Sequence, residues 1–182
     1  MNNGYQIHDQ SATYYMTFQV VEWVDIFTRP HYKQIITSSF EFCRKQKGLQ
    51  LYAYVIMTNH LHLIAGTKSG YNLSDTIRDF KKFTAHQLLK DMHGDAESRK
   101  DWMLKRFEFA AARHTRNSNF QIWTHENHPI ELFSIPVIKQ KMNYIHQNPV
   151  RAGIVLNPED YVYSSASNYA NKPSVIDIDM IW

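Results

Sequence analysis

The stretch that decides the fold is YVIMTNHLHLI at residues 54–64, in which the short polar link Thr58-Asn59 separates two apolar runs. The runs extend over residues 49–57 and 60–67, and both are rich in the aliphatic, β-branched and aromatic residues that favour strands. Two such runs joined by a short polar link are typical of a β-hairpin. The chain is therefore predicted to contain two paired antiparallel strands at its centre.

The second strand of this hairpin carries a histidine pair. Successive side chains of a strand point to opposite faces, so His60 and His62 project together while Leu61 and Leu63 enter the layer on the other side. Two imidazoles on one face can bind one divalent metal ion. The alternative is two solvent-facing histidines on an ordinary half-buried strand.

Upstream of the hairpin, the sequence predicts a strand and a helix. Residues 14–24 favour a strand in which every second residue from Met16 shares one face. Pro30 lies in the first turn of a helix that Gly48 ends. Cys43 follows the apolar spacing of this helix and is predicted to be a small buried hydrophobe, not a reactive thiol.

Downstream, Asn72 or Ser74 caps a second helix with an apolar stripe, and residues 120–124 favour a short strand. A last helix covers residues 134–148 and is stopped by Pro149. On this helix Tyr144 and Asn148 are four residues apart and share a face, on the flank of the core stripe. Taken alone, they are equally the boundary tyrosine and the terminal asparagine of an amphipathic helix.

The order of these elements favours one α+β domain, with an antiparallel sheet and helices on one face. The predicted boundaries are a polar arm over residues 1–12, the domain over residues 13–170 and a tail over residues 171–182. With 182 residues, 43% of them hydrophobic and 20% charged, the chain can build a core of its own.

Composition excludes several classes of protein. The single cysteine rules out an internal disulfide framework. No apolar run approaches the ~18 residues that span a bilayer, and the start of the chain lacks the apolar segment of a secretory signal. We therefore expect a cytoplasmic protein without a membrane partner. No Gly-rich phosphate loop is present, so no nucleotide cofactor is expected.

Two segments together resemble a known family. The run YVIMTNHLHLI, followed some 80 residues later by YIHQNPVRAGIV at residues 144–155, resembles the single-tyrosine HUH transposase superfamily. Within that superfamily the sequence is most similar to the REP-associated tyrosine transposases of bacteria. The resemblance extends over residues 14–169.

This resemblance implies a ferredoxin-like (RRM-like) fold with the HUH motif on a central strand, and cleavage and joining of DNA through a 5′-phosphotyrosine bond. It implies that Tyr144 is the nucleophile and that His60, His62 and Asn148 are ligands of Mg²⁺ or Mn²⁺. Such an ion suits a hard, anionic phosphodiester oxygen. A phenol with an intrinsic pKa near 10 needs polarisation of its target, or proton transfer, to attack at neutral pH.

The sequence departs from the family pattern at two places. Thr58 occupies the position before Asn-His where proline is common, a change that alters turn stiffness but not ligand chemistry. After Trp123 the chain reads THENHP, so that His125, Glu126 and His128 either add to the site or to strand recognition, or form a solvated polar loop.

Basic residues gather in one part of the chain, although the formal net charge is only +3. Residues 78–116 hold ten Lys and Arg against six Asp and Glu. Candidate DNA contacts are Lys81, Lys82, Arg113, Arg116 and Arg151. A solvated helix face is the alternative explanation of this stretch.

The predicted function is that of a metal-dependent DNA endonuclease and strand transferase acting on single-stranded or hairpin DNA with REP-like palindromic repeats. The alternative is a domesticated relative that binds hairpin DNA without cutting it. The expected partner is this DNA, in the bacterial cytoplasm at the nucleoid, and the expected assembly is a monomer or a homodimer.

Overall fold

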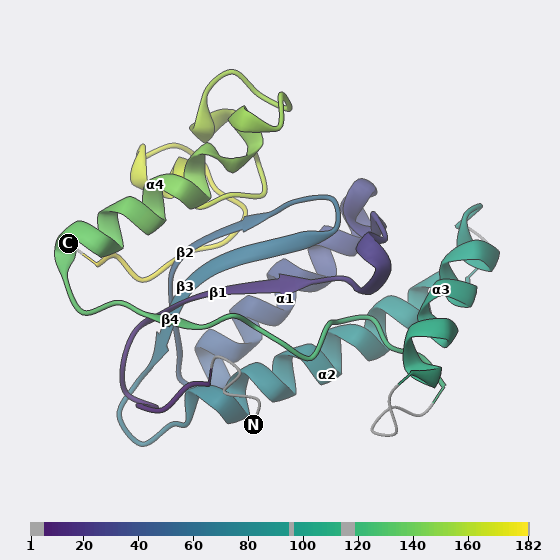
Figure 1. Cartoon of the computed structure of the whole chain (residues 1–182). Coiled ribbons are helices and arrows are strands. Elements are labelled where there is room, and N and C mark those ends of the chain that lie inside the picture. The colour runs from purple at the N-terminus through teal and green to yellow at the C-terminus, as the bar shows by residue number, and fades with distance from the viewer. Residues whose placement is uncertain (1–5, 95–96, 114–118, 182) are drawn as a thin grey trace.

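The computed structural model describes residues 6–94, 97–113 and 119–181. Its centre is an antiparallel sheet of four strands in the order β2-β3-β1-β4 (Figure 1). The strands are β1 (Tyr14–Gln19), β2 (Leu49–Ile56), β3 (His60–Thr67) and β4 (Ile130–Glu131). The predicted β-hairpin is the pair β2 and β3, and its second strand lies between two neighbours, so the central position expected for the histidine pair is confirmed.

Helices cover both faces of the sheet. The helices are α1 (Pro30–Gln46), α2 (Leu73–Met92), α3 (Lys100–Ala112), α4 (Ile135–Arg151) and α5 (Ala166–Tyr169). Helices α1 and α2 pack together on one face, whereas α4 crosses the other face over β2 and β3 (Figure 1). The α+β fold with an antiparallel sheet is confirmed, but the placement of all helices on one face needs this correction. The chain between β4 and α4 crosses the sheet edge and leaves α4 opposite the other helices.

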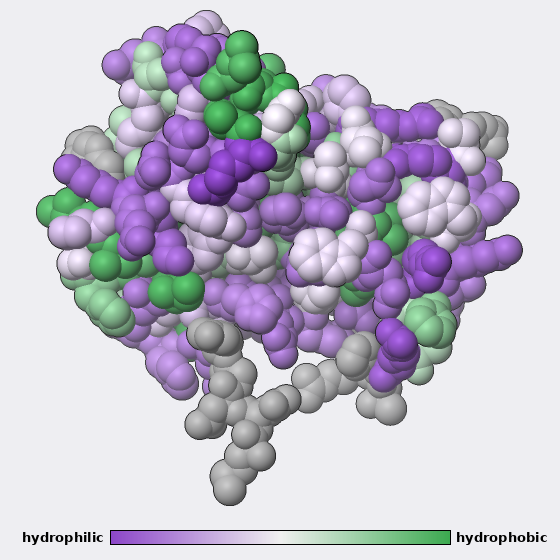
Figure 2. Space-filling model, turned by 45° about the horizontal axis from the view of Figure 1, so that its top comes forward, coloured by the Kyte–Doolittle hydropathy of each residue, from purple (hydrophilic) through white to green (hydrophobic). Residues whose placement is uncertain are grey.

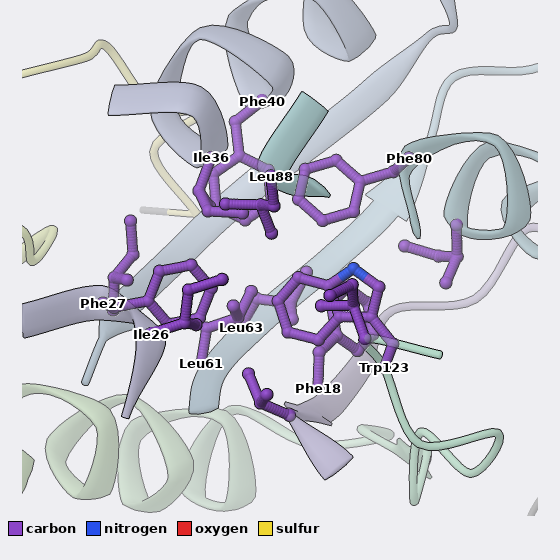
Figure 3. Packing of buried hydrophobic residues seen from close by; sticks show 14 of the residues in the cluster. Phe18, Ile26, Phe27, Ile36, Phe40, Leu61, Leu63, Phe80, Leu88 and Trp123 are labelled. Atoms are coloured by element: carbon purple, nitrogen blue, oxygen red, sulfur yellow. The ribbon is translucent and has the colours of Figure 1, made fainter. Parts of the chain in front are cut away.

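The main core lies between the sheet and the α1–α2 layer (Figure 3). Phe18 and Leu63 project from the sheet and are fully buried. They meet Phe40 of α1 and Phe80 of α2, whose rings stack with centroids 4.7 Å apart. Burial of each such side chain contributes roughly 1.5–3 kcal/mol, so this layer anchors β1 and β3 firmly.

The strand predicted over residues 14–24 ends earlier, at Gln19. The chain then turns through the 3₁₀ helix η1 (Val21–Trp23), in which Glu22 and Trp23 have φ values of 53° and 56°. Residues with left-handed backbone cannot continue a pleated strand. The predicted strand over residues 120–124 is likewise wrong, because that segment pairs with the sheet only through an isolated bridge to Val20.

Helix α4 continues past the predicted stop at Pro149 and ends at Arg151. Proline removes one backbone donor from the helix. The last turn is still closed, because the Ala152 N–H donates to the Asn148 carbonyl at 3.0 Å. Asn148 therefore lies inside the helix and not at its end.

Two local predictions are confirmed. Gly48 follows α1 with a φ of 65°, and a Cβ at this position would collide with the ring of Tyr71. Cys43 is 4% exposed, and burial raises the pKa of its thiol to about 11, as expected of a structural side chain. No helix in the described ranges is both long and apolar enough to span a membrane.

The segment predicted as a tail, residues 171–182, packs on the domain over its described part. The Asp179 N–H donates to the Leu51 carbonyl at 2.8 Å, and one Asp179 carboxylate oxygen accepts from the Leu51 N–H at 2.9 Å. The same oxygen accepts from Arg44 Nε at 3.0 Å. We call these hydrogen bonds of Asp179 the clasp. They pair the backbone N–H and carbonyl of Leu51 on the edge strand β2, which would otherwise present unpaired backbone groups there.

We expect Asp179→Ala to lower the free energy of unfolding by about 1–3 kcal/mol, because the Leu51 N–H and the Arg44 guanidinium each lose an acceptor. Urea unfolding measures the change. Asp177→Ala is the matched control, because this neighbouring carboxylate is exposed and only its backbone carbonyl accepts from Arg44. Equal stability of the two variants would contradict the clasp.

Candidate functional site

The histidine pair lies on the face of the sheet that α4 crosses. Leu61 and Leu63 are fully buried in the main core, and this fixes the pleat of β3 so that His60 and His62 project from the opposite face. The two imidazole rings lie with centroids 4.8 Å apart. His62 is only 7% exposed, so the pair sits in a partly closed site and not on open surface.

The neighbouring strand orients His62. In the register of β1 on β3, Thr17 is directly opposite His62. The hydroxyls of Tyr15 and Thr17 each lie 2.9 Å from His62 Nδ1. A hydroxyl can accept the Nδ1 proton, which leaves the lone pair of the neutral ring on Nε2. Metal-binding histidines are oriented in this way by partners on the other ring nitrogen.

His60 is oriented by its chain neighbour. Its Nδ1 lies 2.7 Å from Asn59 Oδ1. An amide oxygen only accepts, so His60 Nδ1 carries the proton and donates it, and Nε2 keeps its lone pair. Both histidines therefore offer Nε2 as a ligand atom.

Both rings are held in the neutral form. Burial lowers the pKa of His62 to about 3, and the positive charges of His60, Arg151 and Lys141 act in the same direction. Burial also lowers the pKa of His60. A neutral imidazole is the form that binds a metal ion, so the site is prepared for a cation at physiological pH.

Helix α4 brings Tyr144 to the histidines. Met142, Ile145 and Pro149 bury one side of α4 against the sheet, and Tyr144 lies on the flank of this stripe with 41% of its surface exposed. The Tyr144 ring meets the His62 ring edge-on, with centroids 5.4 Å apart. Residues more than 80 positions apart in sequence thus form one site.

Arg151 holds Tyr144 from the end of the same helix. Its guanidinium lies 4.4 Å above the centre of the Tyr144 ring and donates to the Tyr144 carbonyl at 2.9 Å. Asn148, half-buried, follows Tyr144 by one helical turn and therefore shares its side of α4. The structure thus places Tyr144, Asn148 and Arg151 along one flank of one helix.

Sequence reasoning missed Tyr15, which touches nearly every part of the site. Its ring stacks on His62 at 5.6 Å, meets Tyr144 at 6.2 Å, and lies 4.7 Å beneath the Lys141 ammonium. Burial raises the pKa of Tyr15 to about 12. Its hydroxyl is committed to His62, so Tyr144 is the better nucleophile of the two. The sequence does contain a signal for this role, because side chains alternate along β1. Tyr15 and Thr17 therefore lie on the other face of the strand from the residues that enter the core.

The donor set fits a divalent cation with open coordination positions. In the described ranges, no group of three or more His, Cys, Asp or Glu side chains is arranged to enclose a metal ion. Two imidazole nitrogens would leave the remaining positions to water and to substrate oxygens. Such an incomplete protein ligand set is typical of catalytic and not of structural sites.

The predicted DNA-contacting residues lie in different surroundings. Lys81 is tied internally, because its ammonium donates to the Thr124 carbonyl at 2.7 Å and to Asn127 Oδ1 at 2.6 Å. Burial lowers its pKa to about 8. Lys82 is exposed beside it, whereas Arg116 lies outside the described residues.

Arg113 and the polar residues of THENHP lie near the end of β1. Arg113 Nη1 donates to Glu22 Oε1 at 3.1 Å. His128 and Glu126 form an exposed pair, with 3.5 Å between Nε2 and Oε2. The face drawn in Figure 2 is mostly hydrophilic, with apolar residues in separate groups.

The fold and the site together define a class of protein: an α+β domain in which a histidine pair on a central strand meets a tyrosine on a helix. The family profile described as transposase IS200 like matches residues 10–125, which is more than half of the chain. The chain therefore belongs to the IS200-like transposase family. The matched region contains His60 and His62 and ends before Tyr144.

Two solved structures are similar to the chain. A REP-associated tyrosine transposase bound to a REP hairpin is 16% identical, covers 100% of this chain and 92% of its own, and superposes with a TM-score of 0.67. A putative transposase from Deinococcus radiodurans R1 is also 16% identical, covers 80% of this chain and 95% of its own, and has a TM-score of 0.44. No curated protein sequence gives a significant match. The predicted resemblance to REP-associated tyrosine transposases is confirmed.

We expect acid to destabilise the metal-free protein, because His62 and His146 are neutral in the folded state. Burial lowers the pKa of His62 to about 3 and that of His146, which is bonded to Ser165 Oγ, to about 4. Unfolded histidine titrates near 6.5, so below that pH the unfolded chain binds more protons and stability falls. At pH 5 the free energy of unfolding is therefore lower by about 2 kcal/mol for each of these two histidines.

Urea unfolding with a chelator at pH 7 and pH 5 measures this loss. His146→Gln should remove about 2 kcal/mol of this loss, since a glutamine side chain does not titrate. A pH dependence unchanged by this substitution would contradict the assignment.

Proposed function

We propose that the chain is a metal-dependent nuclease and strand transferase that acts on single-stranded or hairpin DNA through a 5′-phosphotyrosine intermediate. The observation that carries this proposal is the convergence of His60, His62 and Tyr144. Two imidazoles with their Nδ1 atoms engaged offer Nε2 toward the site, and an exposed phenol lies against one of them. A bound divalent cation would polarise the scissile phosphate and offset charge on its oxygens.

The chemical step needs one nucleophile and one leaving group. Tyr144 Oη attacks the phosphorus, the bond from phosphorus to the 3′ oxygen breaks, and the strand downstream of the cut stays on the tyrosine through its 5′ phosphate. The phenol proton leaves to solvent, which reaches the exposed side chain, and the departing 3′ oxygen takes up a proton. Attack by a 3′-hydroxyl on the phosphotyrosine reverses these changes and joins the strands.

Arg151 and Lys141 supply positive charge beside the nucleophile. Arg151 stacks on the Tyr144 ring, and Lys141 lies over the Tyr15 ring on the same face. Cations at this position attract the backbone phosphates of DNA and favour the dianionic phosphorus centre of the transition state. Arg151 is thus proposed to contact DNA at the site, whereas Lys82, Arg113 and Arg116 are proposed to contact it farther away.

Hairpin DNA is the proposed substrate because the similar REP-associated transposase was solved bound to a REP hairpin. A groove of about 820 Å³ between α2 and residues 120–129 is lined by Arg78, Lys81 and Lys82. Because Lys81 is tied to the wall of this groove, the exposed side chains of Arg78 and Lys82 are the ones that can reach phosphates. We propose that this groove holds the duplex part of the hairpin.

We expect a covalent protein–DNA adduct when the protein is incubated with Mn²⁺ and labelled synthetic DNA hairpins that carry single-stranded flanks. Denaturing electrophoresis detects the adduct. Tyr144→Phe should abolish it, because the nucleophilic oxygen is lost, while Tyr71→Phe, which alters an exposed tyrosine near Gly48, should not.

An adduct that persists in Tyr144→Phe would contradict the assignment of the nucleophile. Tight, salt-sensitive binding of the DNA hairpin without an adduct in any variant would contradict cleavage and favour the non-cleaving binding protein.

We expect Thr17→Val and Tyr15→Phe to weaken Mn²⁺ binding, because each removes a hydroxyl that orients His62. Removal of a side chain that orients a metal ligand lowers the affinity for the metal ion roughly 10- to 100-fold. Isothermal titration calorimetry without DNA measures it, independently of cleavage. Thr13→Val, immediately before the same strand, is the control, and equal affinities for Mn²⁺ in the Thr17 and Thr13 variants would exclude the orienting role.

A further inference from the structure

A hollow of about 360 Å³ lies beside the histidine pair, at the point where β1 ends. The segment between α3 and β4 runs alongside β1 and forms its far wall (Figure 1). Two backbone hydrogen bonds hold this wall in place: the Thr124 N–H donates to the Gln19 carbonyl at 2.9 Å, and the Val21 N–H donates to the Ile122 carbonyl at 2.8 Å. We call this feature the Gln19 hollow.

Gln19 connects this hollow to the strand that carries the histidine pair. Gln19 is directly opposite His60 in the register of β1 on β3. Directly opposite residues of an antiparallel pair share a face, with Cβ atoms about 5 Å apart. Gln19 therefore lies next to His60 and also lines the hollow, so a strand whose phosphate lies at the histidines can place its next unpaired nucleotide there.

The polar groups of the hollow suit a neutral ring more than a phosphate. Gln19 and Gln121 contribute amides, and Gln121 is 6% exposed with its Nε2 donating to the Trp123 carbonyl at 2.9 Å. At the rim, Arg113 is paired with Glu22. Glu126 also lines the hollow, so the hollow has no excess of positive charge for a phosphate, whereas Arg78, Lys81 and Lys82 line the groove along α2. Amide side chains recognise base edges that present both a donor and an acceptor, as adenine does.

The backbone at the rim supports a specialised role. Glu22 and Trp23 both have left-handed φ values, which are unfavourable for residues other than glycine, and such residues cluster at functional sites. The Asn59 amide, next to His60, donates to the Trp23 carbonyl at 3.4 Å. The rim of the hollow is therefore tied directly to the strand that carries the histidines.

We propose that the Gln19 hollow binds one unpaired nucleobase next to the scissile phosphate and that Gln19 reads its edge. This inference rests on the proposed function. It adds a feature that determines where the DNA strand is cut. The base enters the hollow unpaired, so the hollow selects single-stranded DNA at the cut while the α2 groove takes the duplex.

Binding to non-cleavable complexes tests this proposal. Tyr144→Phe protein is titrated with synthetic DNA hairpins that carry single-stranded flanks, in which each unpaired flanking nucleotide is replaced in turn by an abasic site. One position should lower affinity by roughly 5- to 100-fold. Adding Gln19→Ala should remove the penalty at that position alone, whereas Gln34→Ala, on the exposed surface of α1, should leave it intact.

The results separate this proposal from the proposed function. Absence of any binding to the DNA hairpins would contradict the proposed function itself. Binding in which Gln19→Ala lowers affinity equally for every oligonucleotide, or leaves the abasic penalty unchanged, would overturn the nucleobase site.

Discussion

The site depends on the register of β1 against β3. Thr17 lies opposite His62, so that two hydroxyls of β1 reach His62 Nδ1 and orient its ring. A slip of one residue would turn every side chain of β1 to the other face and place Phe18 among the histidines. The main core prevents this slip, because Phe18, Leu61 and Leu63 fill one face of the sheet completely. Hydrophobic packing on one face thus determines the geometry of the histidine pair on the other.

Helix α4 completes the site on the face of the sheet opposite the main core. A second, smaller core under α4 contains Tyr15, Ile64 and Ile145, and it joins the helix that carries Tyr144 to the sheet that carries the histidines. His146 adds a buried contact with Ser165, whose hydroxyl also accepts from the Tyr54 N–H. The position of Tyr144 relative to His62 is therefore set by packing and hydrogen bonds on both sides of α4.

The β-hairpin, the central histidine strand and the helices near Pro30 and Asn72 could be predicted because strong local signals mark them. The extent of α4 could not, because one proline inside a helix is tolerated when tertiary contacts bury it, as they do Pro149. The same limit applies to Lys81, which reads as a surface cation in a basic stretch but is tied to Thr124 and Asn127. Such contacts connect α2 to a segment 43 residues away and leave no local pattern. The types of residue that form the site could be predicted from the sequence. The role of Tyr15 could not, because it depends on the register of β1 against β3.

The central claim is that His60 and His62 bind one metal ion beside Tyr144. Electron spin echo spectroscopy of Mn²⁺ bound to the protein tests it most directly, because nitrogen nuclei that ligate the ion modulate the echo. The account predicts modulation from two imidazole nitrogens in the unmodified protein and from one in His60→Ala. Bound Mn²⁺ whose echo carries no nitrogen modulation, or the same modulation after His60→Ala, would contradict it.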